Sequence, residues 1–125
     1  MKISYKNLSF INSLRHALNG IMVAFVRERN LKFQLLFGVV VIAAGILCRL
    51  SYLEWGVILL VCGLVIVCEL INSAVEIAVD LITKKQSIRA KLAKDMCAGA
   101  VLVSSVLAIV IGLLVFYNKV IGIGK

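Results

Sequence analysis

Three acidic residues lie at helical spacing in an otherwise apolar stretch of the chain: Glu69, Glu76 and Asp80. Because their separations are close to two and three helical turns, the three carboxylates share one face of a helix, with Asn72 and Ser73 beside them. Ionisable residues are costly at membrane depth and usually have a partner or a task there. Carboxylates can accept a proton from a hydroxyl or bind a hydrated metal ion, and this face predicts these two kinds of chemistry.

Depth in the membrane separates the two tasks. If Trp55 marks the outer interface, a hydrocarbon core of about 30 Å ends about twenty residues later, near residues 74–75. Glu69 then lies roughly 8 Å inside the inner edge, where a carboxylate can meet the hydroxyl group of a lipid. Glu76 and Asp80 lie at or beyond that edge, where they can meet a hydrated metal ion.

Each of these polar residues also has a structural interpretation. Ion pairs with nearby lysines and arginines could hold helices together, and Asp80 has Lys84 four residues further on. Asn72 could form a hydrogen bond between helices. Glu28 lies between two arginines and could be a surface charge, and Asp95 could be a favourable charge at a helix N-terminus.

Composition predicts the class of protein that carries these residues. Of the 125 residues, 62% are hydrophobic, 16% are charged and none is proline. An average soluble domain is about a quarter charged and under half apolar, so this composition excludes ordinary globular and disordered proteins. The length allows about three membrane spans, and we expect one integral membrane domain over residues 1–125.

The expected fold is an all-α membrane protein with an amphipathic surface helix followed by three spans. Residues 10–27 place apolar residues at helical spacing between polar and basic ones, which is typical of a helix in the membrane interface. The spans are expected at about residues 32–50, 54–82 and 94–117. The four cysteines lack the close spacing of zinc or redox motifs and are expected to be packing residues.

Basic residues predict the orientation. They concentrate before the first span and between the second and third, whereas only Arg49, Lys119 and Lys125 lie on the other side. The N-terminus and the second loop should therefore face the cytoplasm, with the C-terminus outside. This topology and anionic lipid headgroups explain the net charge of +8, so nucleic acid is not an expected partner. No cleavable signal peptide is expected at the start.

Three motifs together resemble the small bacterial diacylglycerol kinase family, which includes the undecaprenol kinases. Residues 69–80 read Glu-Leu-Ile-Asn-Ser-Ala-Val-Glu-Ile-Ala-Val-Asp and match the family pattern E-x-x-N-[ST]-A-[IV]-E-x-x-[VT]-D. Ala93-Lys94-Asp95 is followed by small residues at 98–100, and Glu28-Arg29-Asn30 follows the amphipathic helix. The resemblance covers residues 10–116.

The resemblance implies a homotrimer in the bacterial cytoplasmic membrane that transfers the γ-phosphate of ATP to a lipid alcohol, with each site on the cytoplasmic side and shared between subunits. Small residues in the first and third spans also favour a homo-oligomer. By the resemblance, Glu69 would be the general base, and Glu28 and Glu76 would bind Mg²⁺. The implied nucleotide contacts are His16, Glu28, Glu76, Gln86, Lys94 and Asp95, and the implied lipid contacts are Glu69, Asn72 and Ala98.

The lipid remains open between undecaprenol and diacylglycerol. Residues 79–83 and 98–101 are more similar to the undecaprenol kinases, whereas Met96 after Lys94-Asp95 is more similar to the diacylglycerol kinases. Residues 84–87 lack the acidic and histidine character of the latter branch, and His16 stands where that branch has an aromatic nucleotide contact.

A small transporter or a proton-path subunit is the alternative function, because glutamates inside a membrane also serve as ion relays. Such a path needs ionisable groups near the middle of the bilayer. The middles of the three expected spans, around Ala43, Leu60 and Leu107, are apolar, whereas the acids gather at the inner edge. This distribution favours chemistry at one membrane face.

Overall fold

The computed structural model of the chain describes residues 9–85 and 87–122. Four α-helices follow one another there: α1 (Phe10–Arg27), α2 (Arg29–Leu47), α3 (Tyr52–Ile82) and α4 (Ile88–Gly122). Three of them, α2, α3 and α4, are long and apolar enough to cross a membrane. The predicted all-α architecture, one N-terminal helix followed by three candidate spans, is confirmed.

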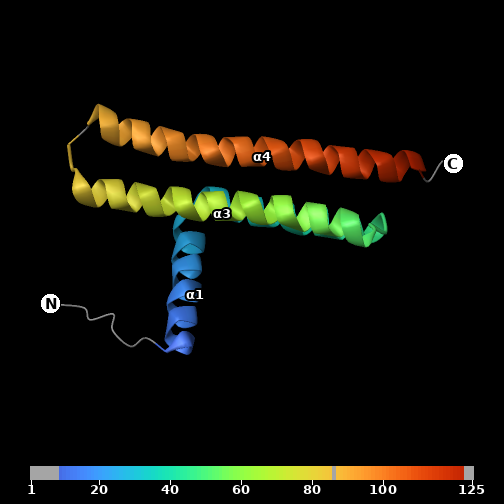
Figure 1. Ribbon diagram of the computed structural model, residues 1–125, viewed down its shortest axis with the longest axis horizontal. Coiled ribbons are helices and arrows are strands. Elements are labelled where there is room, and N and C mark those ends of the chain that lie inside the picture. The colour runs from blue at the N-terminus through green and yellow to red at the C-terminus, as the bar shows by residue number, and fades with distance from the viewer. Residues whose placement is uncertain (1–8, 86, 123–125) are drawn as a thin grey trace.

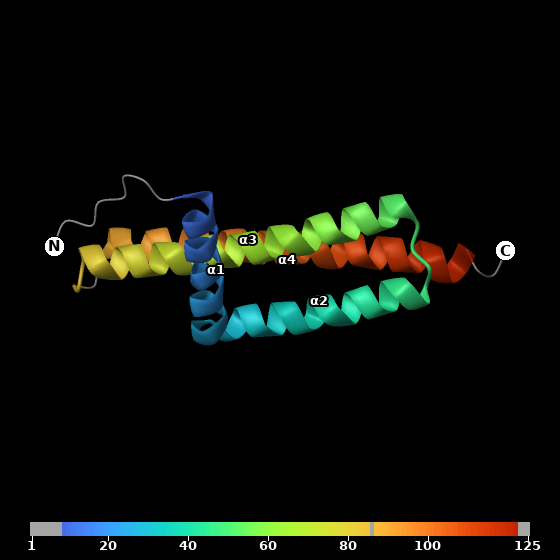
Figure 2. The ribbon, with the colours of Figure 1, turned by 90° about the horizontal axis from the view of Figure 1, so that it is seen from below.

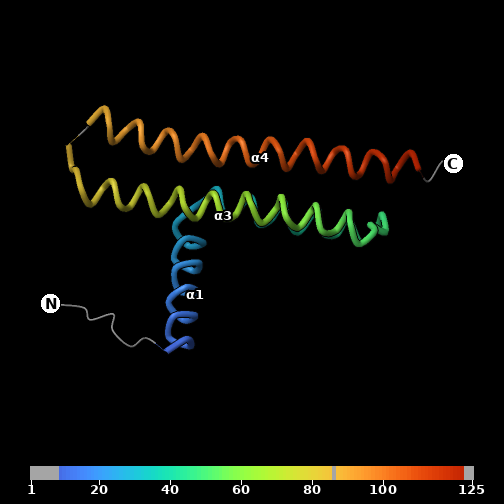
Figure 3. Tube along the Cα trace, in the orientation of Figure 1, coloured from blue at the N-terminus to red at the C-terminus, as the bar shows by residue number. Residues whose placement is uncertain are grey.

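The candidate spans form a bundle, and α1 lies across it (Figures 1 and 2). α3 and α4 run antiparallel and share the most extensive contact between helices of the described chain, while α2 packs on α3 (Figure 3). α3 has 31 residues and α4 has 35, more than the roughly 20 that a hydrocarbon core requires. Beyond the level of α1, these two helices continue as a pair to the turn that joins them (Figure 2).

Local sequence explains where the helices begin. The Ser9 hydroxyl accepts a hydrogen bond from the backbone N–H of Asn12 at the start of α1. Ser51 and Glu54 form a capping box at the start of α3, with the Glu54 carboxylate accepting from the Ser51 backbone N–H at 2.7 Å. Glu28 ends α1 and precedes α2 in an extended conformation (φ −94°, ψ 114°), so α2 leaves in a new direction.

A Schellman motif ends α2 and reverses the chain. The Leu50 backbone N–H donates to the carbonyl of Gly45 at 3.1 Å, and that of Arg49 donates to the carbonyl of Ile46 at 3.2 Å. Arg49 takes the left-handed position of the motif, with φ 53°, and Leu50 is buried beneath the turn. The turn returns the chain so that α3 packs against α2.

Gly45 is buried where α2 meets α3. A Cβ atom at this position would lie 2.7 Å from Cη2 of Trp55 and 3.0 Å from Cδ1 of Leu50. We therefore expect Gly45→Ala to lower the free energy of unfolding by about 1–3 kcal/mol, because overpacking displaces the indole. Thermal unfolding in detergent micelles measures this change. Gly63→Ala is the control, since nothing lies within 4 Å of a Cβ there, and equal stability of the two variants would contradict the packing.

Candidate functional site

The buried face of α3 changes from apolar to polar at Glu69. Ile58, Val61 and Val65 are buried at helical spacing, and the same face continues with Glu69, Asn72 and Ser73. These three polar residues are only 2%, 8% and 5% exposed. Glu76 is half-buried and Asp80 is exposed, so burial within the protein decreases along α3 from Glu69 to Asp80.

An amide from α2 binds the buried Glu69 carboxylate. Nε2 of Gln34 donates a hydrogen bond to Oε2 of Glu69 at 3.0 Å, across the contact between α2 and α3. Sequence reasoning missed Gln34. The available signal was its position as the last polar side chain before the apolar run of the first span, where an amide is expected to bond to another helix.

In the part of the chain that the structure describes, buried polar atoms without partners occur on Gln34 and on the two residues that follow Glu69 on the buried face of α3. Nδ2 of Asn72 donates to Oε1 of Glu76 at 3.2 Å. This bond connects a residue beside Glu69 to the next carboxylate along the acidic face of α3, which Glu69, Glu76 and Asp80 form. Oδ1 of Asn72, Oγ of Ser73 and Oε1 of Gln34 are buried and have no partner among the described residues. Because buried polar atoms nearly always have partners, this arrangement is expected where a ligand, a water or another chain completes the network.

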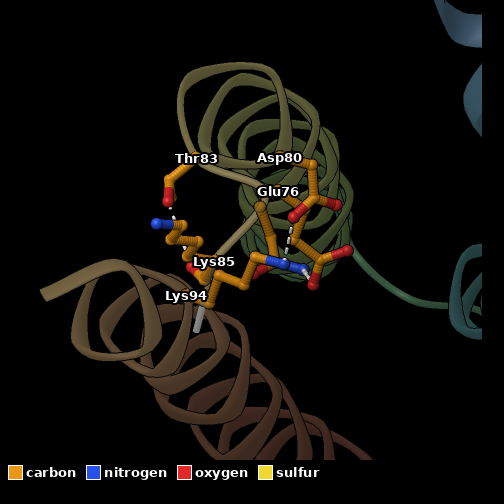
Figure 4. A network of polar contacts seen from close by, with 6 residues as sticks. Glu76, Asp80, Thr83, Lys85 and Lys94 are labelled. Carbon is orange, nitrogen blue, oxygen red and sulfur yellow. Dashed lines mark hydrogen bonds and ion pairs between the residues drawn. The ribbon is translucent and has the colours of Figure 1, made fainter. Parts of the chain in front are cut away.

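Lys94 of α4 reaches the acidic face beyond the level of Glu69. Its Nζ atom donates to Oδ1 of Asp80 at 2.5 Å, and Figure 4 shows the side chain crossing from α4 toward the part of α3 that carries Glu76 and Asp80. The partner of Asp80 is therefore Lys94 and not Lys84. α3 ends at Ile82, so Lys84 lacks the helical geometry of an i, i+4 pair, whereas the antiparallel α4 brings Lys94 across.

A basic pocket of about 610 Å³ lies between the end of α3 and the start of α4. Four lysines and one aspartate are its charged lining residues: Asp80, Lys84, Lys85, Lys91 and Lys94. A pocket with this charge favours an anionic ligand such as a polyphosphate. The charge also agrees with the nucleotide contact that the resemblance implies for Lys94.

The other described residues of the expected site lie on α1, at the junction of α1 and α2, and on α4. Glu28 lies at the junction of α1 and α2, with its side chain 19% exposed and Oε1 3.5 Å from Nε of Arg27. His16 is exposed on α1, whose N-terminal part projects away from α3 and α4 (Figure 1). Asp95 and Ala98 are exposed on α4, and Gln86 lies outside the described residues.

Comparison with known proteins gives the family. Residues 15–116 match the prokaryotic diacylglycerol kinase family. The chain belongs to this family. It is 44% identical to the undecaprenol kinase of Bacillus subtilis over 110 residues, which are 88% of this chain and 89% of that protein. It is 41% identical to the diacylglycerol kinase of Synechocystis over 80% of this chain and 58% of that protein, and 33% identical to that of Helicobacter pylori over 73% and 71%.

This prokaryotic diacylglycerol kinase family member is a multi-pass membrane lipid kinase of the diacylglycerol or undecaprenol kinase type. The resemblance that three motifs indicated is thereby confirmed. The chain acts on a membrane lipid and ATP, and the function is that of a kinase and not of the transporter considered as the alternative.

Proposed function

We propose that this kinase transfers the γ-phosphate of ATP to undecaprenol and forms undecaprenyl phosphate. The likeness to the Bacillus subtilis undecaprenol kinase carries this proposal, because it has both higher identity and higher coverage of the two chains than the likeness to the Synechocystis diacylglycerol kinase. Diacylglycerol is the second candidate, since the latter relative is still 41% identical.

Glu69 is the general base in this proposal. The lipid hydroxyl oxygen attacks the γ-phosphorus, the bond to the bridging oxygen of ADP breaks, and the hydroxyl proton passes to the Glu69 carboxylate. The burial of Glu69 and the unpartnered atoms of Asn72 and Ser73 support this role, because a lipid headgroup entering there would find both an acceptor and hydrogen-bonding partners. Asn72 and Ala98 are proposed to contact the lipid.

Mg²⁺ is the proposed metal, with Glu28 and Glu76 as its protein ligands. Carboxylate oxygens fit this ion, which usually takes one or two carboxylates together with phosphate oxygens and water. When bound, it would neutralise negative charge on the phosphates of ATP. Glu76 follows Glu69 by about 10 Å of helix, so the two carboxylates can serve different tasks.

The nucleotide is proposed to bind near Glu76, at the end of the bundle where α3 ends and α4 begins. Lys94 and Asp95 are the proposed contacts on α4, with Gln86 and His16 as further contacts. The basic pocket beside Lys94 supports this location, because phosphate oxygens can replace Asp80 as the partner of the lysine. Since ATP is cytoplasmic, this end and the N-terminus would face the cytoplasm of a bacterium, with the C-terminus outside.

A homotrimer with sites shared between neighbouring subunits is the proposed assembly. α1 supports it, because its N-terminal part projects away from α3 and α4 of the same chain, where a neighbouring subunit can lie (Figure 1). We expect a trimer by native mass measurement of the detergent-solubilised protein and by chemical crosslinking in membranes. A purified monomer with full activity would contradict this assembly.

Phosphate transfer from [γ-³²P]ATP tests the proposed function. Purified protein in micelles that contain undecaprenol as the sole lipid alcohol should produce a labelled phospholipid that extracts into organic solvent. The reaction should require Mg²⁺ and should stop when EDTA is added. Folded protein that labels diacylglycerol but not undecaprenol would overturn the choice of lipid, and protein that labels neither would overturn the proposal as a whole.

A further inference from the structure

Gln34 lies where α2 meets the buried carboxylate of α3. Its Nε2 atom is 3.0 Å from Oε2 of Glu69, and no other side chain of residues 9–85 and 87–122 donates to that carboxylate. We infer that Gln34 is a positioning residue for the kinase reaction, which holds the Glu69 carboxylate in one orientation and leaves Oε1 to receive the lipid hydroxyl. This inference rests on the proposed role of Glu69 as general base.

Because Glu69 is buried, the bond from Gln34 is its main means of orientation. Glu69 is 2% exposed and follows an apolar stripe, so little water is available to solvate or orient its oxygens. A glutamate has several rotatable bonds, and a proton acceptor must be held within about 0.5 Å of its productive geometry. A hydrogen bond from a neutral amide to a carboxylate is charge-assisted and is stronger than one between neutral groups. The Gln34 amide can therefore fix the plane of the carboxylate.

The orientation of the amide follows from the same contact. An amide has a donating end and an accepting end, and a carboxylate can be bonded only by the donating NH₂ group. With Nε2 bound to Glu69, Oε1 of Gln34 is buried without a partner among the described residues. A buried acceptor without a partner is unfavourable. The contact with Glu69 therefore fixes which end of the amide faces the carboxylate and leaves Oε1 for the water, ligand or neighbouring chain that completes the network.

A structural role gives a different kinetic result from a positioning role. A bond that only joins α2 to α3 would affect the stability of the protein. Its loss would then lower the rate by the same factor whether residue 69 is a glutamate or a glutamine. A bond that positions the base should affect kcat, leave the KM for Mg-ATP unchanged and lose its effect once the base is removed. A double-mutant cycle between positions 34 and 69 separates the two roles.

Gln34→Met is the variant to test, because methionine nearly keeps the shape of glutamine and cannot donate. We expect kcat for lipid phosphorylation to fall by about 10–100-fold while the KM for Mg-ATP stays within about twofold of the original. In the Glu69→Gln background, adding Gln34→Met should change the rate by less than about twofold. Ser104→Ala is the control, since Ser104 is buried but its hydroxyl donates to the Val101 carbonyl of its own helix.

Helical content and thermal unfolding in micelles establish that each variant is folded. A Gln34→Met rate within about twofold of the original, or an equal fall in rate in both backgrounds, would overturn the positioning role while leaving the base assignment intact. If Glu69→Gln alone kept the original rate, the proposed base would be wrong and the inference would fall with it. That result is distinguishable because it does not involve Gln34.

Discussion

Glu69→Gln is expected to reduce lipid phosphorylation by about 10²–10⁴-fold, the usual contribution of a general base. Glutamine keeps the size of the side chain and can still bond to the amide of Gln34, but it cannot take up the hydroxyl proton. The protein should therefore fold normally and bind Mg-ATP with nearly unchanged affinity. Rates with labelled ATP, together with nucleotide-binding titrations on the same preparation, measure both quantities.

Glu54→Gln is the matched control for that substitution. Glu54 also lies on α3, but at the opposite end of the helix, where its Oε2 atom pairs with Nζ of Lys119 at 2.8 Å. Its replacement removes an ion pair and retains a side chain that can still cap the helix. We expect Glu54→Gln to keep the rate of phosphorylation within about twofold. A comparable loss of rate in both variants would show that the effect at Glu69 is not specific to the site.

Glu76→Gln is expected to act on Mg-ATP binding and not on proton transfer. The substitution removes a carboxylate that is proposed to bind Mg²⁺, while the new amide can still bond to Asn72. The apparent KM for Mg-ATP should rise by about tenfold or more, and added magnesium should recover part of the activity. Rates at several magnesium concentrations and binding titrations for both variants make the comparison.

The two glutamates are thus expected to give opposite patterns. If Glu69→Gln lost Mg-ATP affinity while Glu76→Gln retained it, the assignment of base and metal ligand would be reversed. If both variants lost only kcat, neither carboxylate would bind the metal. These outcomes follow from the positions of the carboxylates on α3, where Glu69 is fully buried and Glu76 is half-buried.

The helices and the acidic face could be predicted from the sequence because they depend on local pattern. Long apolar runs predicted the three candidate spans, and amphipathic spacing predicted α1 as the separate helix Phe10–Arg27. The spacing of Glu69, Glu76 and Asp80 predicted that one helix carries all three, as α3 does, whereas their order of burial is known only from the structure. Family motifs gave the kinase function before any comparison with relatives.

Contacts between helices could not be predicted in this way, because they depend on how the helices pack. The bond from Gln34 to Glu69 joins residues 35 positions apart, and the pair of Asp80 with Lys94 depends on the antiparallel course of α3 and α4. The small residues of the first span were expected to favour a homo-oligomer, whereas the contact of Gly45 with Trp55 of the same chain could be identified only from the structure.

Competition between two lipid alcohols tests the central claim most directly. Purified protein is supplied with [γ-³²P]ATP and Mg²⁺ in micelles that contain undecaprenol and diacylglycerol at equal mole fractions, and the labelled lipids are separated and counted. We predict that undecaprenyl phosphate is the main labelled product and that Glu69→Gln abolishes its formation. Phosphatidic acid as the main product would contradict the proposed substrate, and undiminished label with Glu69→Gln would contradict the proposed mechanism.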